Sequence, residues 1–334
     1  MGKIRNIKEL ADLAGVSTGT VSRALAGSEL ISLKTRERIQ ALAREHDFRP
    51  NVLARNLRIQ RTQTIGVLIP LGHEAGQHMS DPFFITMLGL LADALTERGY
   101  DLLLSRVVPA DDGWLARMTD SGRVDGVIVI GQSDQAGTID RVAARYRPLV
   151  VWGGYRPGQV HCSVGVDNRL GGDLAAGHLI ARGCRRIAFL GDARALEIEQ
   201  RLLGVRDALA RAGLEGGLQV LPTALVAQTA REGIGAFLAQ ASEMPDGIVA
   251  ASDVIAMSAL SALAEQGRAV PGAVRVIGFD GLPLGEQTVP PLSSVRQDIA
   301  AGAGHLVSML LRRIAGEETA SVVMTPELVL RGSS

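Results

Sequence analysis

The sequence predicts a small all-α helix-turn-helix head followed by an α/β body of two lobes, each a doubly wound parallel sheet. Two observations predict this division. Short amphipathic helical patterns separated by glycine fill the first 50 residues, whereas short apolar runs alternate with helical stretches from residue 62 onward. Strands that alternate with helices are typical of parallel sheets covered on both faces. A chain of 334 residues is long enough to bury more than one core.

Capping residues define the helices of the head. Asn6 with Glu9 three residues later is a capping box, and Gly15 is placed to end that helix in a left-handed conformation. Ser17 is expected to cap a second helix and Ser32 a third. Two helices joined by a tight glycine turn form a helix-turn-helix.

The charge of the chain is divided unevenly. Residues 1–61 contain 12 Lys and Arg against 6 Asp and Glu, whereas the other residues contain 23 against 29. A basic head on an acidic body favours a head that binds a polyanion, although a solvated pair of basic helices would have the same charge.

Composition excludes several classes of protein. No apolar run reaches the roughly 18 residues of a membrane span, and the N-terminus lacks the apolar core of a signal peptide. We therefore expect a cytoplasmic protein. The two cysteines, Cys162 and Cys184, indicate neither a disulfide framework nor a metal site.

A short helix is expected after the head. In "RPNVLARNLR", residues 49–58, Pro50 ends the third helix and Asn51 can cap a new one of about two turns. A helix this short is marginal alone in water, so it needs a partner.

The motifs of the head resemble those of the LacI/GalR family of bacterial transcription regulators. The resemblance rests on "IKELADLAGVSTGTVSRALAG" (7–27) and "TRERIQALAREHDFRPNVLARNLR" (35–58). It implies that the second helix lies in the major groove of operator DNA. Base-reading positions would be Thr18, Gly19 and Arg23, and phosphate-binding positions Ser17, Thr20 and Ser22. Gly19 has no side chain, which leaves Arg23 as the expected guanine contact.

The resemblance also gives the short helix a role. It implies a hinge that pairs with its copy over the minor groove, with Asn51, Ala54 and Leu57 as the hinge residues. Leu57 would wedge between base steps and bend the DNA. The alternative is a linker helix packed on the body. If the wedge is correct, Leu57→Ala weakens operator binding in a titration but leaves effector binding intact.

The body resembles the periplasmic-binding-protein type 1 fold that the family carries. Strands are expected at 64–70, 100–106, 125–131, 148–153, 186–191, 246–252 and 274–280, and helices at 83–98, 134–145, 168–182, 200–212, 229–240, 253–267 and 298–316. The expected domains are a head (1–49), a hinge and linker (50–61) and an effector-binding and dimerisation body (62–334). Lobe one would be 62–161 plus about 293–323, and lobe two 162–292 plus about 324–334.

Ligands of open parallel sheets bind beyond the carboxyl ends of the strands, which here means the cleft between the lobes. The resemblance places Arg201, Ser252, Asp253, Asp280 and Gln297 there. Further candidates lie at or after the end of a predicted strand: His73, Asp81, Phe83 and Trp152. Each polar residue could instead be a helix cap or a surface ion pair.

We expect neither a cofactor nor a metal. His73 and His78 are five residues apart, whereas a zinc helix of the H-E-x-x-H type needs four.

Two other classes of function fit the sequence less well. An α/β enzyme is disfavoured because G-x-x-x-x-G-K-[ST] and G-x-S-x-G are both absent. A sugar-binding receptor without a DNA function is disfavoured by the head and by the missing signal peptide. The resemblance implies a homodimeric repressor, controlled by a sugar or glucoside, that binds pseudo-palindromic operator DNA. The alternative is an activator or a corepressor-dependent regulator that senses a purine or another metabolite.

Overall fold

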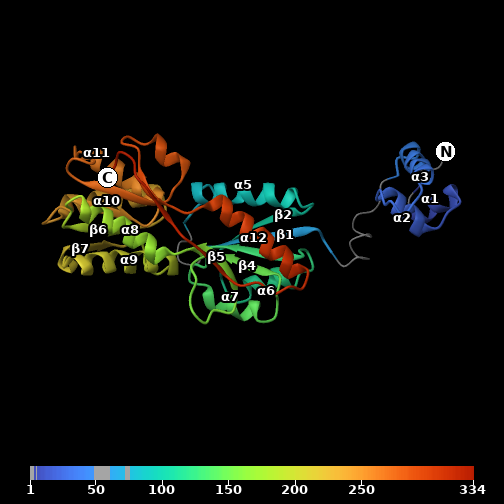
Figure 1. The fold of residues 1–334 in the computed structure, drawn as a ribbon, viewed down its shortest axis with the longest axis horizontal. Helices are drawn as coiled ribbons and strands as arrows, with labels where there is room; N and C mark the ends of the chain where they lie inside the picture. Colours follow the sequence, from blue (N-terminus) through green and yellow to red (C-terminus); the bar gives the residue numbers. More distant parts are fainter. Residues whose placement is uncertain (1–3, 5, 49–60, 72–75) are drawn as a thin grey trace. The chain divides into compact units, whose positions relative to one another are not determined.

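The chain forms two compact units, Met1–Thr62 and Gln63–Ser334, in a computed structural model that describes residues 4, 6–48, 61–71 and 76–334 (Figure 1). Across those residues, every helix is too short or too polar to cross a membrane.

The first unit is built from three helices, α1 (Ile7–Ala14), α2 (Thr18–Leu25) and α3 (Leu33–Glu45). Asn6, Ser17 and Ser32 cap them through side-chain oxygens that accept backbone N–H bonds, and Gly15 ends α1 with φ of 63°. The boundaries predicted at these four residues are confirmed. The predicted end of the third helix at Pro50 is wrong, because α3 already ends at Glu45. The buried side chains, among them Leu10, Val21 and Ile39, form one small core.

Basic side chains of α3 also hold the helices together. Arg38 donates from Nη2 to the carbonyl of Ala14 at 2.9 Å, and Arg36 donates from Nη1 to the carbonyl of Gly27 at 3.1 Å. These carbonyls lie at or beyond the C-terminal ends of α1 and α2, where backbone acceptors lack partners within the helix. Part of the positive charge of the head therefore stabilises the fold itself.

The second unit contains two six-stranded sheets. The first, sheet A, has the order β11-β5-β4-β3-β1-β2, and all its strands are parallel. Its strands are β1 (Thr64–Pro70), β2 (Asp101–Val107), β3 (Gly126–Ile130), β4 (Leu149–Trp152), β5 (Cys162–Val166) and β11 (Val322–Met324). Helices α5 (Pro82–Thr96) and α12 (Ile299–Ile314) pack on one face, and α6 (Trp114–Thr119) and α7 (Ala136–Ala143) on the other.

The second sheet, sheet B, has the order β12-β10-β9-β8-β6-β7, in which only β12 runs antiparallel to its neighbour. Its strands are β6 (Ile187–Leu190), β7 (Leu218–Leu221), β8 (Gly247–Ala250), β9 (Arg275–Asp280), β10 (Ser293–Arg296) and β12 (Glu327–Val329). Its helices are α8 (Asn168–Ala181), α9 (Leu196–Ala212), α10 (Ala227–Gln240) and α11 (Asp253–Glu265); α8 packs against α9, and α10 against α11. The helical first unit and these two helix-covered sheets agree with the predicted fold class.

Two strands lie in the other lobe from the one that the expected boundaries gave them. Strand β5 (162–166) continues sheet A beside β4, and β10 (293–296) continues sheet B beside β9. Each strand joins the sheet that contains the strand before it in the sequence. The chain crosses to the other lobe only afterwards. Hydrogen bonding to the neighbouring strands decides which sheet each strand joins, and apolar runs in the sequence do not indicate it.

Close packing of α8 and α9 depends on two glycines. A Cβ atom on Gly204 would lie 1.9 Å from the carbonyl oxygen of Arg169, and one on Gly172 would lie 2.0 Å from that of Arg201. No larger residue fits at either place without moving the backbone. The two glycines thus fix where α9 lies, and α9 carries part of the candidate site.

Candidate functional site

The first turn of α2 presents an exposed polar surface. Ser17 and Thr18 are exposed there, and the Ser17 hydroxyl accepts from the Thr20 backbone N–H at 3.1 Å. Arg23 is exposed one turn later, and its Nε donates to the carbonyl of Gly19 at 3.2 Å. The predicted base-reading and phosphate-binding positions therefore lie together around one helix end. The predicted hinge residues Asn51, Ala54 and Leu57 lie outside the described residues.

The second unit has a cleft with a volume of about 130 Å³, and both lobes line it at the carboxyl ends of their strands. Sheet A contributes the ends of β1, β3 and β4, and sheet B contributes the ends of β8 and β9. Of the predicted effector residues, seven line the cleft: Asp81, Phe83, Trp152, Arg201, Ser252, Asp280 and Gln297. His73 lies outside the described residues.

Arg201 is the cation of the cleft and is only 7% exposed. Its Nε donates to Asn168 Oδ1 at 2.8 Å and its Nη1 donates to the carbonyl of Ala251. The guanidinium lies 3.7 Å from the centre of the Phe279 ring and 3.9 Å from Asp280. Burial lowers the pKa of Arg201, and the carboxylates around it, Asp280 first, oppose that shift. The guanidinium is thus held rigidly by acceptors already present in the protein.

Asp280 faces Arg201 from the end of β9. Its Oδ1 accepts from Gln297 Nε2 at 2.7 Å, and burial raises its pKa although Arg201 opposes the shift. Its φ is 116°, a conformation that costs on the order of 1–3 kcal/mol for a residue with a side chain. A strained acidic residue beside a cation in a cleft is typical of a binding site.

The prediction that Asp253 lies in the effector-binding cleft is wrong. It is 0% exposed and does not line the cleft. Its carboxylate accepts from the backbone N–H of Leu282 at 2.7 Å and from the hydroxyl of Ser294 at 2.6 Å. It lies at the first position of α11 and fastens the loop after β9, so it supports Asp280 from behind.

Aromatic rings form the lobe-one side of the cleft. Phe83 and Trp152 have ring centres 6.1 Å apart, and Phe83 and Phe84 have centres 6.0 Å apart. Asp81 caps α5 by accepting from the Phe83 backbone N–H at 2.9 Å, which fixes the start of this helix. The cleft therefore combines flat apolar surfaces with a few fixed polar groups, as small-molecule sites do.

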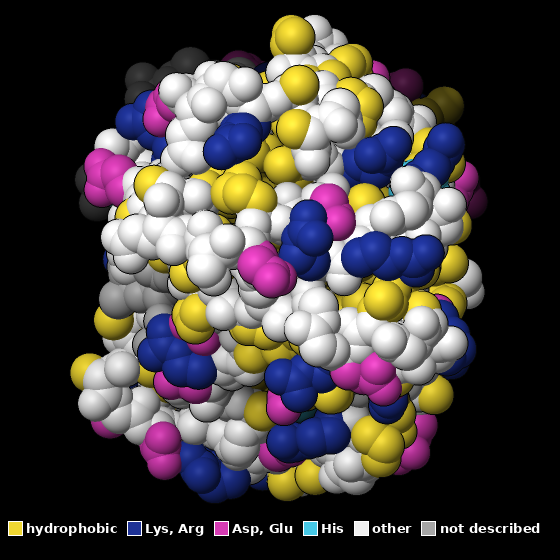
Figure 2. All heavy atoms as spheres, turned by 90° about the vertical axis from the view of Figure 1, so that its left-hand side faces the viewer, with side chains coloured by type: hydrophobic (Ala, Val, Ile, Leu, Met, Phe, Trp, Pro, Cys, Tyr) yellow, Lys and Arg dark blue, Asp and Glu magenta, His cyan; other side chains and the backbone are white. Residues whose placement is uncertain are grey.

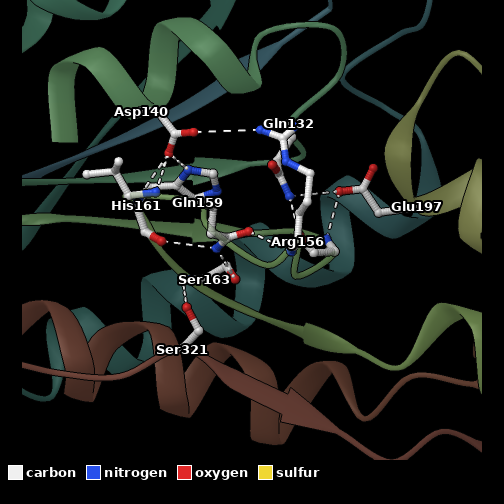
Figure 3. A network of polar contacts seen from close by, with 10 residues as sticks. Gln132, Asp140, Arg156, Gln159, His161, Ser163, Glu197 and Ser321 are labelled. Carbon is white, nitrogen blue, oxygen red and sulfur yellow. Dashed lines mark hydrogen bonds and ion pairs between the residues drawn. The ribbon is translucent and has the colours of Figure 1, made fainter. Parts of the chain in front are cut away.

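Glu197 lines the cleft and was missed by the sequence analysis. It lies one turn before Arg201 on α9, and this spacing of four residues puts both side chains on one face of the helix. That spacing was the signal that could have found it. Glu197 Oε1 accepts from the Gly154 backbone N–H at 2.9 Å and from Gln132 Nε2 at 3.5 Å (Figure 3). It therefore joins lobe two to lobe one.

One face of the second unit lacks the gathered positive charge that is typical of a nucleic-acid-binding surface (Figure 2). On the face in Figure 2, basic and acidic side chains are interspersed rather than gathered by sign. Within the part of the chain that the structure describes, no group of three or more His, Cys, Asp and Glu is arranged to hold a metal ion.

Comparison with known proteins decides the family. The profile described as "Bacterial regulatory proteins, lacI family" matches residues 6–51, and that of a "Periplasmic binding protein-like domain" matches residues 176–334. The HTH-type transcriptional regulator CelR of Thermobifida fusca is 31% identical over 98% of this chain and 97% of its own. The chain belongs to the LacI family.

Two further comparisons agree with this assignment. The HTH-type transcriptional repressor PurR of Pasteurella multocida is 29% identical over 98% of each chain. The structure described as a transcriptional regulator CelR–cellobiose complex superposes with a TM-score of 0.70 at 29% identity, over 99% of this chain and 100% of that one. The protein is accordingly a DNA-binding transcription regulator with an effector-binding domain. LacI-family regulators are not enzymes, in agreement with the sequence analysis.

Proposed function

We propose that the protein is a cytoplasmic repressor that releases a pseudo-palindromic operator when a sugar or glucoside binds between the two lobes. The observation that carries this proposal is the cleft itself. Its aromatic rings, Phe83 and Trp152, offer flat surfaces to sugar rings, and Arg201, Asp280 and Gln297 offer hydrogen bonds to hydroxyl groups.

Relatives support a sugar as the effector. The related CelR structure is described as a complex with cellobiose. The related PurR protein is named a transcriptional repressor, which supports the repressor function. A purine is the alternative effector. The acceptor-rich cleft favours the sugar, because each sugar hydroxyl can donate to a carboxylate.

In the head, Arg23 and Thr18 are proposed to read bases while Ser17, Thr20 and Ser22 contact phosphates. Hydrogen bonds to base edges provide sequence information, and contacts to phosphates position the helix. Gly19 would let the backbone approach the DNA without itself reading a base.

Control would work through the two lobes. An effector that contacts both can shift the protein between two arrangements of the body only through its different affinity for them. A coupling of about 1–3 kcal/mol between effector and operator is the usual size of such effects. Hinge residues Asn51, Ala54 and Leu57 are proposed to transmit the change to the head.

A homodimer is part of this proposal. Strand β2 is an edge strand of sheet A, and Leu104 on it and Val108 just beyond it are 44% and 50% exposed. Ile85 on the neighbouring helix α5 is 55% exposed. An exposed apolar sheet edge is a surface that a second copy can cover.

The test uses the full chain and a pool of random duplex DNA from which bound sequences are selected. We expect a two-fold-symmetric site to emerge, and cellobiose or a related sugar to lower the affinity for it. Arg201→Ala should retain operator binding but lose the response to sugar. Failure to enrich any sequence would refute the DNA-binding part, and release by hypoxanthine rather than by sugars would favour the purine alternative.

A further inference from the structure

The charges of the cleft limit what can bind there. Among the described residues that line it, the ionisable ones are Asp81, Glu197, Arg201 and Asp280. Two carboxylates, Asp81 and Glu197, therefore face one guanidinium. Asp280 adds a carboxyl group that is mostly protonated at neutral pH in the unliganded protein, because burial raises its pKa to about 8. Like charges held in a partly buried site repel more strongly than in water, because the effective dielectric constant is lower.

The protein itself uses part of the single guanidinium. Two of its five N–H groups donate, to Asn168 and to the carbonyl of Ala251, and Asp280 lies 3.9 Å away. A phosphate or carboxylate arriving in the cleft would reach only the remaining N–H donors of this one cation. Sites that bind such groups instead present guanidinium forks with matching geometry.

Helix N-termini at the cleft do not compensate for the missing cations. Helices α5, α9 and α11 all begin near it, and each N-terminus carries roughly half a positive charge. Each helix, however, has its own carboxylate in the cap or first turn: Asp81 for α5, Glu197 for α9 and Asp253 for α11. Of these three, Asp81 accepts from a backbone N–H of its own helix, whereas Glu197 and Asp253 accept from groups outside theirs. The negative charge of an ionised side chain at these positions still offsets the positive helix end.

Glu197 cannot easily turn away to admit an anion. The Gly154 N–H and Gln132 hold its Oε1 from lobe one (Figure 3). Packing is close at this point, since a Cβ atom on Gly153 would lie 2.7 Å from that oxygen. The loop is anchored in turn, because His161 Nδ1 lies 2.6 Å from Asp140 Oδ1 on α7.

We propose that Glu197, with Asp81, makes the cleft selective for an uncharged sugar or glycoside and excludes sugars that carry a phosphate or a carboxylate. Hydroxyl groups donate to carboxylates, whereas a phosphate dianion has only acceptors to offer and is repelled. This inference rests on the proposed function, in which the cleft is the effector site.

The test compares matched pairs of ligands by thermal shift and calorimetry on the full chain. The pairs are glucose and glucose 6-phosphate, cellobiose and cellobionate, and trehalose and trehalose 6-phosphate. We expect at least one uncharged member to bind wild type, and its anionic partner to bind at least 100-fold more weakly.

The matched variants are Glu197→Gln and Glu199→Gln. Both residues lie in the first turn of α9, so both changes alter the charge at that helix end equally, but Glu199 is exposed and does not line the cleft. Glu197→Gln should reduce the discrimination against the anionic partner about tenfold or more, and Glu199→Gln should leave it unchanged.

Three results would overturn the proposal: an anionic member that binds wild type as tightly as its partner, equal effects of the two variants, or a panel in which no uncharged sugar binds. Operator selection with the same preparation separates these failures from failure of the proposed function. Sequence-specific DNA binding with a phosphate-binding cleft would refute the selectivity alone.

Discussion

At the scale of single residues, the properties of the cleft come from buried ionisable groups. Burial raises the free energy of their charged forms. Asp280 and Arg201 are 5% and 7% exposed, so each depends on the other and on fixed hydrogen bonds. Removing one member of such a pair leaves an uncompensated buried charge, which typically costs about 3–5 kcal/mol. These side chains are therefore held in place for a ligand, and holding them there lowers the free energy of unfolding.

This placement predicts how stability depends on pH. Burial raises the pKa of Asp280 to about 8, whereas the unfolded side chain ionises near 3.9. Stability of the unliganded protein should therefore fall as pH rises from about 4 to about 8, because only the folded state resists ionisation. Asp280→Asn should flatten this slope in melting temperatures measured between pH 5 and pH 8.

Asp93→Asn, an exposed change on α5, is the matched control and should keep the wild-type slope. Asp253, whose pKa burial also raises, should preserve part of the slope near its lower end in both variants. An Asp280→Asn curve that runs parallel to wild type would contradict the assignment.

Arg23 is the residue of the head that we expect to read a base. Arg23→Ala should weaken binding to the selected operator by about 1–3 kcal/mol and relax the preference at one base pair, because a bidentate contact is lost. Arg23→Lys keeps the charge but not the fork, so it should recover affinity more than specificity. Repeating the sequence selection with each variant measures both. An unchanged base preference in Arg23→Ala would assign the arginine to the phosphates.

At the scale of elements, the approach of α8 to α9 positions the lobe-two side of the cleft. Helix α9 carries Glu197 and Arg201, and its place is set by backbone contacts at Gly172 and Gly204. A displacement of α9 would move both charged side chains away from Asp280 and Gly154. The packing of α8 against α9 therefore sets the geometry of the proposed effector site.

Gly204→Ala tests this dependence. The added methyl would meet the carbonyl of Arg169, a backbone atom that cannot swing aside, so we expect a loss of roughly 1–3 kcal/mol or more in unfolding free energy. Sugar binding should weaken as well. Gly177→Ala, on α8 with no atom within 4 Å of its new methyl, should instead stabilise by about 0.5–1 kcal/mol. Chemical denaturation of both variants gives the comparison, and equal effects would exclude the close approach as the cause.

At the scale of the whole molecule, a two-fold-symmetric operator requires two copies of the chain. The exposed apolar residues along β2 and α5 form the surface that we propose for pairing. Leu104→Glu should shift sedimentation toward the monomer and reduce operator affinity at least tenfold. Leu203→Glu on α9, also exposed, should leave the dimer intact. A dimeric Leu104→Glu protein would move the interface elsewhere.

Salt dependence tests the electrostatic part of operator binding. If the two heads of a dimer make about six to ten phosphate contacts, affinity should fall about 10³–10⁵-fold between 50 and 200 mM salt. Fluorescence anisotropy on the selected operator measures this slope. A nearly flat slope would be incompatible with heads that neutralise phosphates.

Most features of the head could be predicted from the sequence, because the residues that cap and end its helices act locally. Asn6, Gly15, Ser17 and Ser32 act on backbone groups within a few residues, so their roles follow from spacing alone. The alternation of strands and helices in the body could also be predicted from the sequence. Strands β5, β7, β10 and β11 were not predicted, since none has more than five residues and none forms an apolar run long enough to recognise.

What the sequence by itself determined was the order of elements, the helix caps, the division of charge between head and body, and the residues that follow buried strands. Only the tertiary structure decided which sheet β5 and β10 join, that Asp253 is buried behind the cleft, and that Glu197 reaches across to lobe one. The physical reason is distance along the chain. A cap or an amphipathic period arises between residues a few positions apart. The Glu197–Gly154 bond and the pairing of Asp280 with Arg201 join residues 43 and 79 positions apart, and only the packed fold brings these together.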